Sequence, residues 1–384
     1  MGQVDGNRMV VWHADFLRII FANLCVCTSL YMFLPVVPAC MGPVQLGGAA
    51  AAWRPFVAFA AGACLPAPFC NFWLDAYRRK SVALWALACL VAATALFLLD
   101  LPYYGKWLAR MAQGASYGVF QIAVGSTLLL DLSDTRKRTE AAHVYYWFAR
   151  LALVFGPLAG VMLPLYHGAE AFSAVAVGLQ VCAFLLLSGL RVPFRAPLEP
   201  SLFTFDRFWL PRGFRLFVPL FGVCLVAGLL MGRHCGAGFC VFLGVGFWLA
   251  LWLHRCVFRE RLQRELACGF CSLVVAALLL SCPFADERWL WVVAVFLGCG
   301  LGWTTSRYLL SYIRICEHCE RGTAQSSYML GWDMGLLAGF SCSAGLWGGG
   351  TQACSTYIIL GLCAATGLFH FLCVKPWYMQ NKRK

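Results

Sequence analysis

Apolar runs long enough to cross a bilayer recur along the whole chain. A transmembrane helix needs about 20 mostly apolar residues, and twelve runs of roughly this length follow one another with short polar connections between them. They lie near residues 16–38, 49–71, 82–101, 103–128, 143–166, 171–190, 216–232, 235–254, 265–284, 288–311, 325–347 and 353–374. The sequence therefore predicts an all-α membrane protein with twelve transmembrane helices.

The composition excludes a soluble protein. Hydrophobic residues make up 61% of the chain and charged residues only 12%, whereas charged residues usually make up about 25% of a globular domain. The connections leave no room for a soluble catalytic domain, and no Walker-type phosphate loop is present. We therefore expect neither an enzyme nor a cofactor. The first run is too long for a signal-peptide core and no cleavage pattern follows it, so we expect it to remain as a span.

Basic residues are placed as a topology signal rather than as a nucleic-acid patch. The net charge is +13, and 23 of the 30 Lys and Arg residues fall in alternate connections and at the two chain ends if the amino terminus is cytoplasmic. Cytoplasmic loops of membrane proteins carry such an excess. This predicts a multi-pass membrane protein with both termini in the cytoplasm, and no nucleic-acid partner. The chain has no N-x-S/T sequence, which fits a bacterial inner (plasma) membrane.

The cysteines do not indicate a metal centre. Most of the 21 cysteines lie within the apolar runs, where Cys packs as a small hydrophobe. Cys316 and Cys319 have the spacing of half a zinc site, but no second pair of ligands lies nearby in the sequence. We therefore expect no metal site.

One polar connection divides the runs into two sets of six. Residues 191–214 contain four prolines and four arginines. We expect an N-terminal six-helix bundle at residues 1–190, a cytoplasmic linker at 191–214 and a C-terminal six-helix bundle at 215–384. Many transporters are built from two such repeats, related by an axis along the membrane normal.

The two halves align at an offset of 183 residues, which places Arg138 on Arg321. The same register places Arg150 on Asp333. Two opposite charges therefore occupy equivalent depths in the predicted fifth and eleventh spans.

The connection between the second and third runs carries a charged motif. Residues 71–80 read N-F-W-L-D-A-Y-R-R-K. The segment resembles the signature loop of the major facilitator superfamily, G-x-x-x-D-x-x-G-R-R/K, at Asp75, Arg79 and Lys80. Asn71 and Arg78 stand where the family has glycine. The other interpretation of the basic residues is that they are ordinary cytoplasmic-loop charges.

Two further segments resemble elements of the same superfamily. Arg110 and Gln113 belong to an R-x-x-Q-G sequence in the fourth run, and Gly156, Pro157 and Gly160 form the G-P-x-x-G core of a motif described for antiporters. Small residues let helices approach closely, and proline loosens a helix locally. The resemblance implies the superfamily fold of two six-helix bundles.

The resemblance also implies a conformational role for the signature loop. Its acid, Asp75, is expected to dock near the start of the eleventh span, at residues 321–327, in the outward-open state, because the positive end of a helix favours an anion. Arg321 is a candidate second partner. The residues that we assign to gating are Asp75, Arg79, Lys80, Arg321, Gly156 and Pro157.

Polar side chains recur on one face of the fourth span, at spacings of three, four and four residues, and such a stripe is expected to face water. In the superfamily the first, fourth, seventh and tenth spans line the central cavity, so the resemblance implies that polar residues on these spans contact substrate. The alternative is hydrogen bonding between helices without substrate contact. The candidate substrate-binding residues are Asn23, Tyr31, Arg110, Gln113, Tyr117, Gln121, Trp303, Thr304, Arg307 and Tyr308.

Asp333 is the one acid that the sequence places deep inside a span. A buried charge needs a partner or a water-filled cavity. One interpretation is a structural ion pair, with Arg307 as the first candidate partner. The other is a proton or cation site whose occupancy changes with substrate. Asp333 and Arg150 are the candidate coupling residues.

These features predict a secondary active transporter that moves a small molecule by alternating access of two bundles. The antiporter-like element favours proton-coupled export, whereas four arginines within spans favour uptake of an anionic solute. A membrane sensor or enzyme on the same fold is a third alternative. The expected partners are a small-molecule substrate, the proton and the lipid bilayer, and a monomer is expected.

Overall fold

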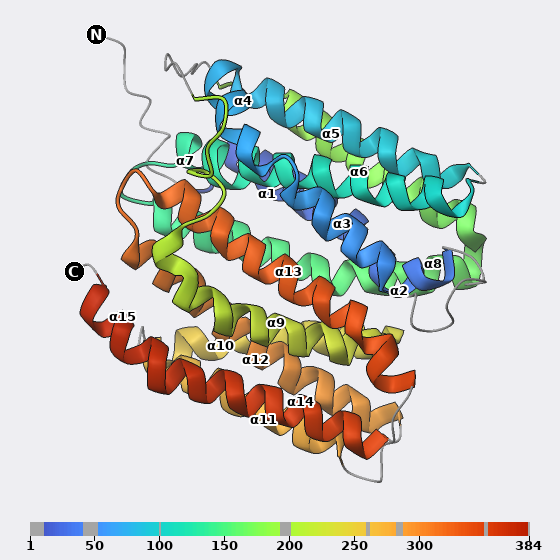
Figure 1. Cartoon of the computed structure of the whole chain (residues 1–384), viewed down its shortest axis with the longest axis vertical. Coiled ribbons are helices and arrows are strands. Elements are labelled where there is room, and N and C mark those ends of the chain that lie inside the picture. The colour runs from blue at the N-terminus through green and yellow to red at the C-terminus, as the bar shows by residue number, and fades with distance from the viewer. Residues whose placement is uncertain are drawn as a thin grey trace.

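A computed structural model of the chain describes residues 11–40, 53–99, 101–192, 201–258, 262–281, 287–348 and 352–382, and every regular element in these ranges is helical. Lipid supplies no hydrogen-bond partners, so each apolar run satisfies its own backbone amides as a helix. The long axes of the helices run roughly side by side through the molecule (Figure 1). The predicted all-α membrane fold is confirmed.

The helices of the first half follow the predicted runs closely. Short helical turns extend several of them, and the turns η3, η4 and η5 continue into or out of a longer helix. The elements are α1 (Ala14–Tyr31), α2 (Phe33–Cys40), α3 (Arg54–Cys64), η3 (Ala67–Phe69), α4 (Cys70–Ala76), α5 (Arg79–Ala95), η4 (Leu96–Leu98), α6 (Tyr103–Gln121), η5 (Ile122–Leu128), α7 (Leu129–Leu132) and α8 (Arg138–Ser188).

The short turn η6, at the end of the linker, leads into the helices of the second half. The elements of this half are η6 (Pro211–Gly213), α9 (Phe214–His234), α10 (Ala237–Leu253), η7 (His254–Phe258), α11 (Leu262–Leu280), α12 (Glu287–Ile315), α13 (Arg321–Gly348), α14 (Gln352–Phe369), η8 (His370–Val374) and α15 (Lys375–Asn381).

Ten helical segments in the described part of the chain are long and apolar enough to cross a membrane. One of them, α8, has 51 residues and covers two predicted runs, and its backbone breaks at Gly168, where φ is 84°. This left-handed conformation suits glycine, which has no Cβ atom. Another predicted run, 325–347, lies within the 28-residue helix α13. The count of twelve spans stays a prediction.

The two halves of the chain lie side by side (Figure 1). Helix α13 of the second half packs against α3 and η5 of the first, and α8 of the first half packs against α10 and α12 of the second. The turn between α4 and α5, residues 201–213 and the turn between α12 and α13 lie together at one end of the helices, on the left of Figure 1. We call this the linker end.

Glycines allow the closest helix contacts. A Cβ atom on Gly114 of α6 would lie 2.0 Å from the carbonyl oxygen of Phe59 on α3. A Cβ atom on Gly246 of α10 would lie 2.9 Å from the Cα atom of Gly298 on α12. Association of helices in lipid depends on such close packing, because burial of apolar surface gains little there.

We predict that Gly114→Ala destabilises the protein, because the added methyl group meets backbone that cannot move aside without separating α6 from α3. Overpacking of this kind costs about 1 to 3 kcal/mol. The matched control is Gly178→Ala on α8, where a Cβ atom meets nothing within 4 Å. Thermal unfolding of the detergent-solubilised variants measures the difference, and equal melting temperatures for both variants would contradict the packing argument.

Candidate functional site

Asp333 lies at the interface between the two halves. It belongs to α13 of the second half, yet both carboxylate oxygens accept hydrogen bonds from the first half. The Tyr31 hydroxyl donates to Oδ1 at 3.0 Å, and the Tyr117 hydroxyl donates to Oδ2 at 3.0 Å. Trp332 Nε1 donates to the Tyr31 hydroxyl at 2.9 Å and fixes it in place. The carboxyl group therefore joins the two halves through tyrosine hydroxyls.

Arg307 is not the partner of Asp333, which corrects the expected ion pair. The Arg307 guanidinium instead bonds the carboxylate of Glu265 on α11 and lies 2.8 Å from His254 Nδ1. His254 Nδ1 also lies 3.1 Å from Glu265 Oε2. Glu265 is 1% exposed, so Asp333 is not the one buried acid. The sequence placed Glu265 at the edge of its apolar run and gave no indication of its depth.

Arg150 contacts the opposite half of the protein, as Asp333 does, but from the first half. It belongs to α8 of the first half, and its guanidinium donates to Ser306 Oγ at 3.1 Å and to the Tyr328 hydroxyl at 2.7 Å, both in the second half. The ring of Trp147 lies under the guanidinium, with the centroid 5.1 Å from Cζ. The two positions that the internal repeat aligns thus reach across the interface in opposite directions.

The polar stripe of α6 divides into two parts. Arg110 donates to Gln113 Oε1 at 2.8 Å, and Gln113 donates to Thr94 Oγ1 at 2.9 Å. The Arg110 guanidinium also packs on the rings of Phe33 and Phe59, 5.3 and 4.8 Å from their centroids. Arg110 and Gln113 are buried among other helices and do not line the central cavity, in contrast to the expected water-facing stripe.

The second part of the stripe, Tyr117 and Gln121, faces a small cavity between the two halves of the protein, which we call the central cavity. Its volume open to water is about 40 Å³, which is room for a few water molecules. The lining is mainly apolar and includes four aromatic and two thioether side chains. Asp333 is the sole charged residue among the described ones that line the cavity. These residues are Phe59, Ala63, Tyr117, Gly118, Gln121, Ile122, Tyr146, Phe208, Ser326, Met329, Leu330, Asp333 and Met334.

The candidates on the first span lie beside this cavity. Gln121 Nε2 donates to Asn23 Oδ1 at 2.9 Å, and Tyr31 bonds Asp333. The sequence missed Phe59, Tyr146 and Phe208, since aromatic residues within or between apolar runs carry no signal that separates a cavity wall from ordinary packing.

The candidates on α12 face neighbouring helices of their own half. Trp303 Nε1 donates to the carbonyl oxygen of Ala250 at 3.1 Å, and Thr304 Oγ1 donates to that of Gly300 at 2.7 Å. The Tyr308 hydroxyl lies 2.8 Å from His370 Nδ1. The Trp303 and Tyr308 contacts join two helices and correspond to the helix-to-helix alternative, whereas the Thr304 bond lies within α12 itself.

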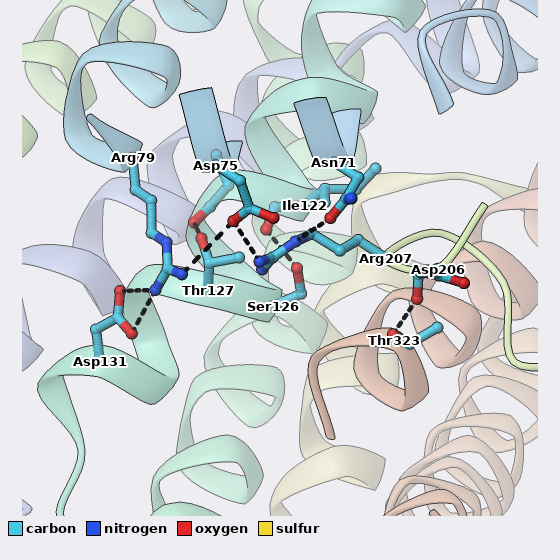
Figure 2. Close-up of polar contacts among 11 residues, drawn as sticks. Asn71, Asp75, Arg79, Ile122, Ser126, Thr127, Asp131, Asp206, Arg207 and Thr323 are labelled. Carbon is cyan, nitrogen blue, oxygen red and sulfur yellow. Dashed lines mark hydrogen bonds and ion pairs between the residues drawn. The ribbon is translucent and has the colours of Figure 1, made fainter. Parts of the chain in front are cut away.

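The signature loop forms a charged cluster at the linker end (Figure 2). Asp75 is buried and accepts a hydrogen bond from Arg207 Nη2 at 2.6 Å, while Arg207 Nε donates to Asn71 Oδ1 at 2.7 Å. Arg79 binds both oxygens of Asp131 at 2.7 and 2.6 Å and lies 3.8 Å from Asp75. The loop thus ties α4, α5 and α7 to one arginine of the linker.

The partner of Asp75 corrects the expected docking on α13. The described contacts of Asp75 do not include Arg321, because the linker lies between the signature loop and the start of α13. On its other side the linker binds that start: Thr323 Oγ1 donates to the carbonyl oxygen of Asp206, and the Leu210 amide donates to Ser327 Oγ at 2.7 Å. The acid and the helix are therefore connected through the linker.

The remaining gating candidates hold helices of the first half together. Lys80 Nζ donates to the carbonyl oxygens of Ser188 and Leu190 at 2.7 Å each, at the end of α8, where a cation is favoured. A Cβ atom on Gly156 would lie 2.6 Å from Cβ of Tyr31. The element containing Gly156 and Pro157 thus packs α8 closely against α1, beside the tyrosine that bonds Asp333.

Comparison with known proteins identifies the family. The family model described as "Major Facilitator Superfamily" matches residues 19–340. The chain belongs to the major facilitator superfamily. It is therefore a secondary transporter of the membrane, as the signature loop and the division into two halves predicted. No curated protein matches the chain in sequence.

Solved transporters share the fold of this superfamily member. The human organic anion transporter MFSD10 (TETRAN) is 16% identical, with 93% of this chain and 98% of that chain covered and a TM-score of 0.68. The POT family transporter PepTSo is 12% identical, with 96% and 99% covered and a TM-score of 0.70. A bacterial homologue of the iron transporter ferroportin in an outward-facing state is 16% identical, with 94% and 99% covered and a TM-score of 0.67.

We predict that the Glu265–Arg307 pair is structural. Removing one partner leaves a buried charge without its counterion, which costs about 3 to 5 kcal/mol. Glu265→Leu and Arg307→Met should each lower the melting temperature, and the double variant should unfold at a higher temperature than either single variant. The control is Arg212→Met, which breaks the exposed pair with Glu317 and should change the melting temperature little. Additive losses in the double variant would contradict the pairing.

Proposed function

We propose that this superfamily member is a proton-coupled exporter of small molecules and that Asp333 couples the two movements. The observation that carries the proposal is the position of the Asp333 carboxyl group, which lines the central cavity and bonds tyrosines of the opposite half. Carboxyl groups buried within membrane spans are commonly part of proton or ion pathways when they are not held in an ion pair. This one also contributes to closing the interface.

The coupling follows from competition for one group. A proton on Asp333 neutralises it, and a substrate bound to the carboxylate displaces the proton. Either event alters the hydrogen bonds from Tyr31 and Tyr117, which join the halves. Because a ligand shifts a conformational equilibrium only through contacts that differ between the states, a group at the moving interface is well placed to link occupancy to access.

The charge of the cavity favours a cationic substrate. Aromatic rings attract a cation through their faces, and Phe59, Tyr117, Tyr146 and Phe208 lie in the same lining as Asp333. Three of the four arginines that suggested an anion are bound elsewhere in the described part of the chain: Arg110 to Gln113, Arg150 to Tyr328 and Arg307 to Glu265. The human neighbour in fold is named an organic anion transporter, so anion uptake is retained as the competing outcome of the experiments.

The proposal also includes the orientation of the protein in the membrane. The linker end carries the basic signature loop and Arg207, Arg212 and Arg215, and such an excess marks the cytoplasmic side. We place this end in the cytoplasm of a bacterial cell, with the protein as a monomer in the inner membrane. In this orientation the contacts of Asp75 form a gate on the cytoplasmic side.

We predict that Asp333→Asn abolishes transport driven by a pH gradient, because Asn keeps the shape of Asp and loses the titratable charge. The probe is ethidium, a permanent cation whose fluorescence reports its movement, in proteoliposomes with an imposed pH gradient and a clamped membrane potential. Glu140→Gln, at an exposed position of α8, is the control and should transport like the unmodified protein. Full gradient-driven transport by Asp333→Asn would remove Asp333 from coupling.

We predict that the site distinguishes ligands by charge. Tetraphenylphosphonium and tetraphenylborate have the same shape and opposite charge, and a ligand that binds the folded state raises the melting temperature. The cation should raise the melting temperature of the unmodified protein, and Asp333→Asn should abolish this effect. Stabilisation by the anion alone would instead support uptake of an anionic solute.

A further inference from the structure

In the described part of the linker, residues 201–213, successive residues along the chain bind different halves of the protein. The Thr204 amide donates to the carbonyl oxygen of Pro68 in the first half at 3.0 Å. Asp206 then binds Thr323 of the second half, and Arg207 binds Asn71 and Asp75 of the first. Figure 2 shows the Arg207 side chain directed to Asn71 and Asp75 of α4, whereas the carbonyl oxygen of the neighbouring Asp206 accepts a hydrogen bond from Thr323 of α13.

The next residue, Phe208, reaches the central cavity. It lies in the same lining as Asp333, Tyr117 and Met329, although it is about 90 residues or more from each of them in the chain. Its amide donates to the carbonyl oxygen of Phe205 at 2.9 Å, so the linker makes a tight turn at this point. Phe208 is thus held between the Arg207 contacts on one side and the Leu210 contact with Ser327 on the other.

We propose that the linker is part of the substrate site: Phe208 forms the wall of the central cavity at the linker end, and Arg207 is the positioning residue that holds it there. This rests on the proposed transport of a cation through the same cavity. A substrate that enters from the opposite end meets the Phe208 ring as the floor of the site, and a ring face next to a carboxylate attracts an organic cation.

The same contacts determine when the site opens at the linker end. The linker continues directly into α9 of the second half, so it moves with that half when the two separate. Separation at this end must therefore break the bonds that the linker makes with the first half, which are those of Arg207 to Asn71 and Asp75 and that of the Thr204 amide to Pro68. Phe208 then leaves the cavity floor and the substrate is released.

Binding of tetraphenylphosphonium tests the role of Phe208. Phe208→Ala should weaken binding on the order of tenfold, as followed by thermal shift titration. Phe208→Tyr, which retains the aromatic face, should bind like the unmodified protein, and this variant separates a loss of the ring from a failure to fold. The control is Phe205→Ala, since Phe205 is exposed and packs on Phe203 outside the cavity. Equal affinity of Phe208→Ala and Phe205→Ala would overturn the proposal.

Hydrogen exchange tests the role of Arg207 without any ligand. Arg207→Gln should speed amide exchange of residues 201–213 and of the cavity-lining segment 326–334 several-fold, because the linker end opens more often. Arg212→Gln, which affects only the exposed pair with Glu317, should leave exchange in both segments unchanged. Unchanged exchange in Arg207→Gln would show that Arg207 does not hold the linker, and would overturn this part of the proposal.

The two experiments separate this inference from the proposed function. If tetraphenylphosphonium binds in a manner that depends on Asp333 but not on Phe208, the transport proposal stands and the linker proposal fails. If the cation does not bind the unmodified protein, the proposed cation site fails and the substrate-wall role of Phe208 fails with it. The exchange measurement then decides the positioning role of Arg207 independently of any substrate.

Discussion

A charged side chain inside a bilayer span needs a partner, because lipid supplies neither counterions nor hydrogen bonds. The buried charges described here meet that requirement in three ways. Arg307 binds the buried acid Glu265, and Arg110 binds Gln113 and packs on two phenyl rings. Arg150 and Asp333 bind hydroxyl groups. Except for Gln113, which lies on α6 together with Arg110, these partners lie on facing helices.

The pairings differ in whether they cross the interface between the halves. The described contacts of Arg307 and Arg110 stay within one half, so a movement of one half against the other leaves these contacts intact. Those of Asp333 and Arg150 cross the interface in opposite directions and must change when the halves separate. This division explains why Asp333, rather than the more deeply buried Glu265, is the candidate for coupling. A group whose bonds change with access can link its protonation to access, whereas a group with fixed bonds cannot.

The linker adds a second set of contacts that depends on the same movement. The signature loop holds Asp75 and Arg79 within the first half, and Arg207 extends this cluster to the linker. Through the Asp206 and Leu210 contacts the linker also binds the start of α13, the helix that carries Asp333. Helix α13 and the linker therefore connect the central cavity to the charged cluster at the linker end. This connection fits a transporter in which the gate and the substrate site change together when the two halves move.

The sequence alone determined the membrane fold, the family and the charged loop. Lipid requires long apolar helices, and such helices are visible as runs of residues, while Asp75 and its basic neighbours stand in a local motif. The internal repeat also aligned Arg150 with Asp333. Only the tertiary structure decided the partners. Arg307 binds Glu265 rather than Asp333, and Asp75 binds Arg207 rather than Arg321. Residue spacing gives the face of a helix, but the rotation and neighbours of that helix depend on packing against all the others. Phe208 lay beyond prediction for the same reason, because the path of a linker between two bundles follows from their surfaces and not from its own pattern.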